Sequence, residues 1–297
     1  MLEISAFKKL LDSKKCWLLD GATGTELERR GVFTQLPFWT ALAVEEHAGI
    51  LSDIHREYLS AGCQILTANT FRISWYLFEK HQQEDKFFPL LRKTCELARS
   101  VLPINSGVLL AASITTLEDC YRPDLVPDES TLLKYHKTQL EALDVCPVDF
   151  ILAETINSIK EAAVIMQLCA EMKLPLILSF VTNGEGELLS AEKIIDLLKI
   201  AEQFSPIGMS INCGPVPEIL NDAIILAGHF EGVKGIYANA PGKPHPDHGW
   251  EAANNACPVL EHFAGEMIDL HFKIIGGCCG TTPEMLHAIQ NRTILHT

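Results

Sequence analysis

The chain has 297 residues, of which 38 are Asp or Glu and 24 are Lys or Arg, giving a formal net charge of −14. This length suits one large α/β domain that buries its core without disulfides. The acidic balance, without a basic run, argues against a nucleic-acid partner. No apolar stretch approaches the roughly 20 residues of a membrane helix, and the N-terminus lacks a signal-peptide core. We therefore expect a cytoplasmic protein that acts on small molecules.

Residues 1–15 mix apolar side chains with lysines and predict a short amphipathic helix that leads into the domain. Eight short apolar runs follow, nearly unbroken, as is typical of parallel strands buried on both faces. These runs are Trp17–Leu19, Gln64–Thr67, Val108–Ser113, Phe150–Ala153, Leu176–Phe180, Met209–Ile211, Gly235–Ala238 and Lys273–Ile275. Helical spacing predicts helices at Val44–Ala61, Thr131–Val145, Ser158–Lys173, Ala191–Phe204 and Pro217–His229, and a last one capped by Thr282 and begun by Pro283.

Eight strand–helix units predict a (β/α)8 TIM barrel, a fold of about 250 residues. An open, doubly wound sheet has the same alternation, and periodicity alone does not exclude it. No linker or repeat divides the sequence, so we expect a single domain over residues 1–297. In a TIM barrel the C-terminal ends of the strands form the active site, and nearly every predicted strand ends in a polar or thiol group. These groups include Asp20, Asn69, Ser113, Glu154, Thr182, Asn212, Cys213, Asn239, Cys278 and Cys279.

Ten cysteines are present, and in a cytoplasmic protein most thiols stay reduced. Seven are scattered singly and are typical of small buried hydrophobes: Cys16, Cys63, Cys95, Cys120, Cys146, Cys169 and Cys257. The other three differ, because Cys213 follows the sixth run and Cys278 and Cys279 follow the eighth, so all can meet at one rim. Three thiolates around one zinc ion leave a fourth position open, as in a catalytic site. The alternative is a pair of buried thiols or a vicinal disulfide.

Glycines flank the Cys278–Cys279 pair. Neighbouring residues on a strand point in opposite directions, so both sulfurs reach one metal only if the backbone turns, which glycine permits. A free thiol has a pKa of about 8.5, and zinc would hold a substrate thiol as the thiolate at neutral pH. Such a site favours alkylation of a thiol.

Two acidic residues, Asp20 and Glu154, end the first and fourth predicted strands without an obvious basic partner. They suit the ammonium group of an amino acid, while the backbone N–H groups of Gly21 and Ala22 suit its carboxylate. Alternatively, Asp20 caps the helix that begins near Gly24, and Glu154 caps the one near Ser158.

Several other motifs carry weaker signals. His245-Pro-Asp247-His248 resembles a metal cluster, but its proline favours an exposed loop. Residues 20–24 are glycine-rich but lack the Lys and Ser/Thr of a phosphate-binding loop. Phe38, Trp39 and Trp250 could face a cationic methyl donor, although we expect at least two of them to be packing residues.

The motifs together resemble the homocysteine S-methyltransferase family, over residues 19 to 283 and in the family's order. They are Leu-Asp-Gly-Ala-Thr-Gly-Thr-Glu-Leu (19–27), Thr-Ala-Asn-Thr-Phe (67–71), Glu154-Thr155, Asn212-Cys213-Gly214 and Gly-Gly-Cys-Cys-Gly-Thr-Thr-Pro (276–283). The resemblance implies a TIM barrel with zinc on three cysteines, Cys213, Cys278 and Cys279. It also implies that homocysteine binds near four residues, Asp20, Gly21, Ala22 and Glu154.

The methyl donor varies within that family: S-methylmethionine, S-adenosylmethionine, betaine, or a cobalamin- and folate-bearing module. Many members have a Gly-Pro-rich loop after the third strand, where this chain reads Ser-Ile-Thr-Thr-Leu-Glu-Asp-Cys-Tyr-Arg-Pro (113–123). The C-terminal motif is more similar to cobalamin-dependent methionine synthase, but only 14 residues follow Pro283, too few for further modules or a betaine-type extension. We therefore expect a sulfonium donor such as S-methylmethionine.

These observations predict an enzyme that transfers a methyl group to homocysteine and yields methionine. One alternative is methylation of another small thiol or selenol. Another is a non-catalytic protein that binds zinc or a thiol amino acid and has lost the donor site. Product formation with several donors separates these alternatives.

Overall fold

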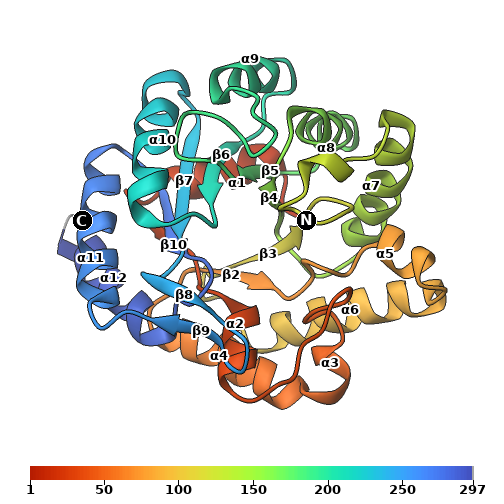
Figure 1. Cartoon of the computed structure of the whole chain (residues 1–297), viewed down its shortest axis with the longest axis horizontal. Helices are drawn as coiled ribbons and strands as arrows, with labels where there is room; N and C mark the ends of the chain where they lie inside the picture. The colour runs from red at the N-terminus through yellow and green to blue at the C-terminus, as the bar shows by residue number, and fades with distance from the viewer. Residues whose placement is uncertain (296–297) are drawn as a thin grey trace.

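The computed structural model describes residues 1–295, in which an eight-stranded parallel sheet is rolled into a barrel (Figure 1). In sheet order the strands are β1 (Trp17–Leu18), β10 (Ile274–Gly277), β7 (Val233–Ala238), β6 (Gly208–Asn212), β5 (Leu176–Phe180), β4 (Phe150–Ile156), β3 (Leu109–Ile114) and β2 (Ile65–Ala68). All eight predicted apolar runs coincide with these strands. Their strand ends therefore gather at one rim, as the sequence predicts.

The barrel closes between β1 and β2. The Asp20 N–H donates to the Ile65 carbonyl at 2.9 Å, the Gln64 N–H donates to the Leu18 carbonyl at 2.8 Å, and Leu19 bridges Ile65 in parallel. This closure excludes the open, doubly wound sheet and confirms the predicted (β/α)8 barrel.

Helices surround the barrel (Figure 1). They are α2 (Thr23–Arg29), α3 (Ala43–Glu46), α4 (Ala48–Ser60), α5 (Trp75–Lys80), α6 (Glu84–Ser100), the short 3-10 helix η1 (Pro123–Leu125), α7 (Glu129–Asp144), α8 (Ile159–Met172), α9 (Ile194–Phe204), α10 (Val216–His229), α11 (Ala256–Asp269) and α12 (Pro283–Leu295). The last helix starts as predicted, with Pro283 first and the Thr282 hydroxyl accepting the Met285 N–H at 3.4 Å.

Two predicted helix boundaries are wrong. The helix predicted over Val44–Ala61 breaks at His47, but Val44 and Leu51 on its two halves are both fully buried, so apolar spacing did not reveal the break. The helix predicted from Ala191 begins at Ile194 instead. Ala191 has a φ of 63°, a left-handed conformation that a helix interior excludes.

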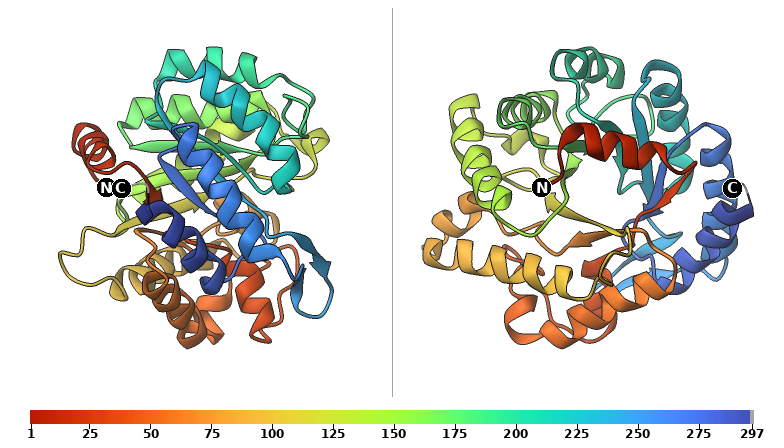
Figure 2. Two further views of the ribbon diagram at one scale, coloured as in Figure 1. Left: turned by 90° about the vertical axis from the view of Figure 1, so that its left-hand side faces the viewer. Right: turned by 180° about the vertical axis from the view of Figure 1, so that it is seen from behind.

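The predicted N-terminal helix is α1 (Ile4–Asp12), which lies across the N-terminal end of the barrel (Figure 2, right). Phe7 and Leu11 on its buried face are 0% exposed, and Phe7 stacks on Phe150 with ring centroids 4.7 Å apart. The Trp17 indole N–H donates to the Leu11 carbonyl at 3.1 Å. Helix α1 therefore covers the inner core of the barrel at the end opposite the predicted site.

The His245–His248 motif lies at the tip of an antiparallel hairpin formed by β8 (Gly242–His245) and β9 (Gly249–Ala252), where residues 246–248 form an exposed turn, as predicted. The two imidazole rings stack with centroids 3.5 Å apart. Across the described residues, no helix combines the length and apolar character required to cross a membrane.

Replacing Phe7 with alanine tests the role of α1. Removing a fully buried phenylalanine should lower the free energy of unfolding by about 3–5 kcal/mol. Denaturant titration measures this change, with Ile104→Ala as the control because Ile104 is 92% exposed. Equal, small changes in both variants would contradict the assignment of α1 as part of the inner core.

Candidate active site

A cavity of about 400 Å³ opens among the C-terminal ends of the strands. The seven site residues predicted from the sequence all line it: Asp20, Gly21, Ala22, Glu154, Cys213, Cys278 and Cys279. They come from the ends of β1, β4, β6 and β10, which lie around the full circumference of the barrel. The fold thus brings residues more than 250 positions apart into one cavity.

The three cysteine sulfurs lie within 4.8 Å of one another, and the sulfurs of Cys213 and Cys279 are 3.7 Å apart. Zinc–sulfur bonds of about 2.3 Å in a tetrahedral site place two sulfurs about 3.8 Å apart. The spacing and the soft thiol donors of this cluster therefore suit a zinc ion.

Backbone hydrogen bonds from the end of β7 hold both cysteine segments. On one side, the Cys213 N–H donates to the Tyr237 carbonyl at 3.2 Å, and the Asn239 side-chain amide donates to the Cys213 carbonyl at 3.1 Å. On the other side, the Cys278 N–H donates to the Ala238 carbonyl at 2.7 Å. In addition, the Ala240 N–H donates to the Cys279 carbonyl at 2.9 Å. Because β7 lies between β6 and β10, its end sets the separation of the thiols.

The backbone turns at the cysteine pair as predicted, and a flanking glycine, Gly280, takes a left-handed conformation there. The left-handed residues of the cluster are Cys213, with φ 61°, and Gly280, with φ 76°. Gly277, before the pair, is needed for close approach, because a Cβ atom there would lie 2.4 Å from the Thr281 hydroxyl oxygen. The turn closes through the Thr281 N–H, which donates to the Cys278 carbonyl at 3.1 Å.

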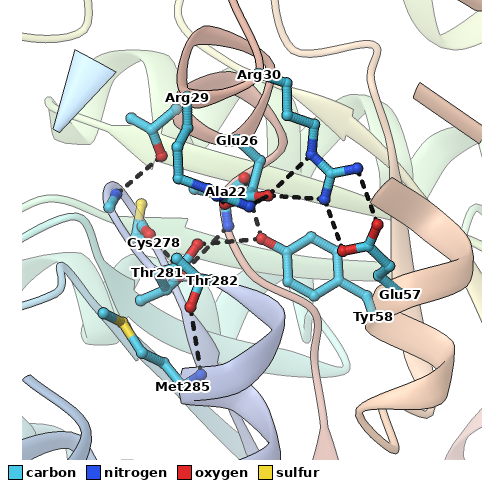
Figure 3. Close-up of polar contacts among 12 residues, drawn as sticks. Ala22, Glu26, Arg29, Arg30, Glu57, Tyr58, Cys278, Thr281, Thr282 and Met285 are labelled. Carbon is cyan, nitrogen blue, oxygen red and sulfur yellow. Dashed lines mark hydrogen bonds and ion pairs between the residues drawn. The ribbon is translucent and has the colours of Figure 1, made fainter. Parts of the chain in front are cut away.

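Thr281 also joins the cysteine turn to the segment after β1 (Figure 3). Its hydroxyl accepts the Ala22 N–H at 3.2 Å and donates to the Cys278 carbonyl at 2.7 Å. The Tyr58 hydroxyl lies 3.1 Å from the Ala22 carbonyl and 3.2 Å from the Thr281 carbonyl. The Ala22 N–H, one of two predicted donors for a substrate carboxylate, is therefore already engaged.

Asp20 is 2% exposed and accepts two hydrogen bonds from Thr67, from its N–H at 2.8 Å and its hydroxyl at 2.9 Å. Burial raises the pKa of Asp20 to about 8, although the bonds from Thr67 oppose this shift. The capping alternative is wrong, because α2 has no side-chain cap and Ala22 occupies its N-cap position. The carboxyl group instead lines the cavity.

Glu154 accepts hydrogen bonds from the Ser113 hydroxyl and from the Tyr237 hydroxyl, the latter at 3.1 Å. Burial raises the pKa of Glu154 to about 7 against these two bonds. Ser158 caps α8 instead, since its hydroxyl accepts a hydrogen bond from the Glu161 N–H at 3.4 Å. Glu154 therefore does not cap α8, and its side chain lines the cavity.

The electrostatics of the cavity favour cations. Hydrogen bonds from Cys278 and Cys279, with a contribution from Tyr121, lower the pKa of Cys213. A negative sulfur cluster therefore shares one small space with the two buried acids, Asp20 and Glu154. A metal ion at the sulfurs and an ammonium group at the acids would each reduce this repulsion.

Two other polar residues predicted at the strand ends, Asn69 and Ser113, also line the cavity, whereas Asn212 supports the site without lining it. The Asn212 side chain accepts the Thr155 N–H at 3.0 Å and donates to the Thr155 hydroxyl at 2.8 Å. These bonds hold Thr155 in a left-handed conformation, with φ 60°, directly after Glu154. Asn212 therefore positions an acid of the cavity from two strands away.

The aromatic prediction is confirmed: two of the three residues pack, and one lines the cavity. Trp39 lines it, with its indole N–H donating to Glu28 at 2.9 Å. Phe38 packs on Phe78 with ring centroids 4.9 Å apart, and Trp250 packs against the main core.

Sequence reasoning missed Tyr121. Its hydroxyl lies 2.9 Å from the Cys213 sulfur and lines the cavity. Partial removal of the hydroxyl from water and the negative charge of the neighbouring thiols raise the pKa of this phenol. The only signal in the sequence was that residues 113–123 form an unusual loop after β3.

Comparison with known proteins gives consistent results. The sequence model of the homocysteine S-methyltransferase family matches residues 17–293. The chain is 27% identical to a selenocysteine Se-methyltransferase of Brassica oleracea var. italica, over 93% of this chain and 88% of that protein. It is also 27% identical to the S-methylmethionine–homocysteine S-methyltransferase BHMT2 of Mus musculus, over 94% and 78%.

A solved structure shares the fold: the metallated form of the homocysteine methyltransferase MmuM from Escherichia coli. The TM-score is 0.82 at 24% identity, covering 96% of this chain and 98% of that one. The family match spans the β1 segment, both acids and all three cysteines of the cavity. This chain belongs to the homocysteine S-methyltransferase family.

Proposed function

We propose that this protein transfers a methyl group from a small sulfonium compound to the sulfur of homocysteine, at a zinc ion held by Cys213, Cys278 and Cys279. The observation that carries the proposal is the convergence of three sulfurs and two buried acids in one cavity. A thiol amino acid fits both features, because its sulfur can bind the metal and its ammonium group can bind the acids.

The acceptor side of the cavity is built for a cationic group. Glu154 and Asp20 provide carboxylates whose raised pKa values reflect burial without a basic partner. An ammonium group beside them restores ionisation and forms charge-assisted hydrogen bonds. Ser113, Tyr237 and Thr67 orient the two carboxylates, so little reorganisation accompanies binding.

Bound zinc would supply the positive charge that keeps a substrate thiol deprotonated at neutral pH. The thiol proton leaves to solvent before the transfer. The homocysteine sulfur then forms a bond to the methyl carbon, while the electrons of the donor's carbon–sulfur bond remain on the departing thioether. The protein's residues align the two sulfurs for this displacement and surround them with a partly closed cavity.

The donor side carries aromatic and apolar residues. Trp39 and Phe71 line the cavity, with their rings tilted at 75° and their centroids 6.1 Å apart. Leu36 and Arg72 also line it, and Arg72 offers a positive charge for a donor carboxylate. Aromatic faces attract a sulfonium cation. Similarity to the mouse enzyme named for S-methylmethionine further supports a sulfonium donor.

Similarity to the Brassica enzyme named for selenocysteine supports a second candidate acceptor, a small selenol. Selenocysteine shares the ammonium and carboxylate of homocysteine, and its selenol is more acidic than a thiol. Parallel assays with homocysteine and selenocysteine decide which acceptor is preferred.

The metal centre is tested by replacing each cavity cysteine with serine. We expect one zinc per chain in the unmodified protein and a sharp loss of zinc in Cys213→Ser, Cys278→Ser and Cys279→Ser, because a neutral hydroxyl is a poor ligand. Metal analysis after dialysis measures this ratio. Cys257→Ser, on α11, is the control and should retain zinc. Retention of zinc by the three cavity variants would contradict the proposed centre.

The acceptor site is tested with Glu154→Gln. This change removes a charge-assisted hydrogen bond to the ammonium, so homocysteine affinity should fall about ten- to hundredfold, equivalent to roughly 1.5–3 kcal/mol. Calorimetric titration of the zinc-loaded protein measures the affinity, and metal analysis checks that zinc remains. Glu171→Gln, on the outer helix α8, should bind like the unmodified protein. Unchanged affinity in Glu154→Gln would refute its role in binding the ammonium.

The donor is tested by mass spectrometry of methionine formed with S-methylmethionine, S-adenosylmethionine or betaine. Since a thioether is a weaker base and a better leaving group than the tertiary amine that betaine releases, the rate with a sulfonium should exceed the rate with betaine at least about tenfold, or about 1.4 kcal/mol in barrier height. Comparable rates with betaine would overturn the sulfonium assignment while leaving the acceptor site intact.

A further inference from the structure

A tyrosine outside the three-cysteine cluster contacts it directly. The Tyr121 hydroxyl oxygen is 2.9 Å from the Cys213 sulfur, although more than half of the Tyr121 residue, 52%, is exposed to solvent. The ring thus lies at the edge of the cavity with its polar end directed inward to the sulfur. Two residues 92 positions apart meet here, so the contact depends on the path of the loop between β3 and α7.

That loop is anchored by the side chain of Glu161, which is buried and hydrogen-bonded to the buried His136. The Leu117 N–H donates to the Glu161 carboxylate at 2.8 Å, and the same carboxylate oxygen is 2.8 Å from the His136 imidazole. Glu161 and His136 are both 0% exposed. A backbone amide held by a fully buried carboxylate has little freedom to move.

Two further anchors lie closer to the tyrosine. The Asn157 side chain, 0% exposed, donates to the Cys120 carbonyl at 3.0 Å, immediately before Tyr121. Glu118 is bonded through its side chain to Tyr76 and Lys80. The anchors on α5, α8 and the β4–α8 segment therefore fix the loop so that the hydroxyl stays on the sulfur.

The distance distinguishes an outer partner from a metal ligand. Sulfur and oxygen ligands of one tetrahedral zinc lie about 3.5 Å apart, given bonds of about 2.3 and 2.0 Å. The 2.9 Å separation is shorter and fits a hydrogen bond instead. A phenol hydroxyl carries a proton to donate, whereas a thiolate can only accept, so in this pair the hydroxyl donates and the thiolate accepts.

We propose that Tyr121 is a positioning residue that donates a hydrogen bond to the Cys213 thiolate and thereby tunes the metal centre. The inference rests on the metal centre of the proposed function. Three thiolates around a divalent ion carry one excess negative charge, and the phenol offsets part of the charge on one of them. Removing the hydroxyl makes Cys213 a stronger electron donor, and the bound ion then acidifies a substrate thiol less.

The test uses cobalt in place of zinc, because thiolate-to-cobalt charge transfer is visible. In Tyr121→Phe the band should move to longer wavelength, since a thiolate without a hydrogen bond releases its electrons more easily. One cobalt per chain should still bind, because all three thiols remain. The pH midpoint of the spectral change on adding homocysteine should move upward.

Tyr135→Phe is the matched control, because the Tyr135 hydroxyl bonds Glu79 on the outside of the barrel. An unchanged band in Tyr121→Phe would overturn the inference, as would an equal shift in Tyr135→Phe. If the unmodified protein binds no cobalt at its thiols, the metal centre itself is wrong and the inference falls with it. If cobalt binds but its absorption band is the same in Tyr121→Phe, only the role of Tyr121 is wrong, and the metal centre is still supported.

Discussion

The hydrogen bonds at the end of β7 are the constraint on which the rest of the site depends. Residues 237–240 hold Cys213 on one side and the Cys278–Cys279 turn on the other, through bonds of 2.7 to 3.2 Å. Both cysteine segments leave their strands in directions set by left-handed residues, and β7 spans the space between them. The separation of the thiols is therefore set mainly by backbone hydrogen bonds.

A second property of the site is concentrated negative character in a small, partly buried volume. The thiols and the acids Asp20 and Glu154 share one cavity, and burial raises the pKa of both acids. Repulsion between these groups and their removal from water destabilise the protein when the cavity is empty. Bound cations would offset this destabilisation. The same electrostatics would favour each cation of the proposed reaction: the metal, the ammonium of the acceptor and a cationic methyl donor.

Periodicity predicted the eight strands because each is a short apolar run, and barrel architecture placed their ends at one rim. The predicted site residues followed from that rule and from a resemblance in which the cysteine motifs are specific. Sequence patterns were less informative where the same pattern is compatible with more than one local structure. Apolar spacing continued through the break at His47, and capping remained open for Asp20 until its carboxylate was found bonded to Thr67.

The sequence by itself determined the eight strands, the three thiols and the two acids, because strand periodicity and chemically distinctive residues are local properties of the chain. Closure of the sheet into a barrel was seen only in the pairing of the segments of β1 and β2. Only the tertiary structure decided how the thiols are held and which side chains reach them. The contact between Tyr121 and Cys213 spans 92 residues, and that between Ala22 and Thr281 spans 259. No periodic pattern in the sequence predicts either contact, since each depends on the path of a loop between strands and not on the residue pattern within a strand.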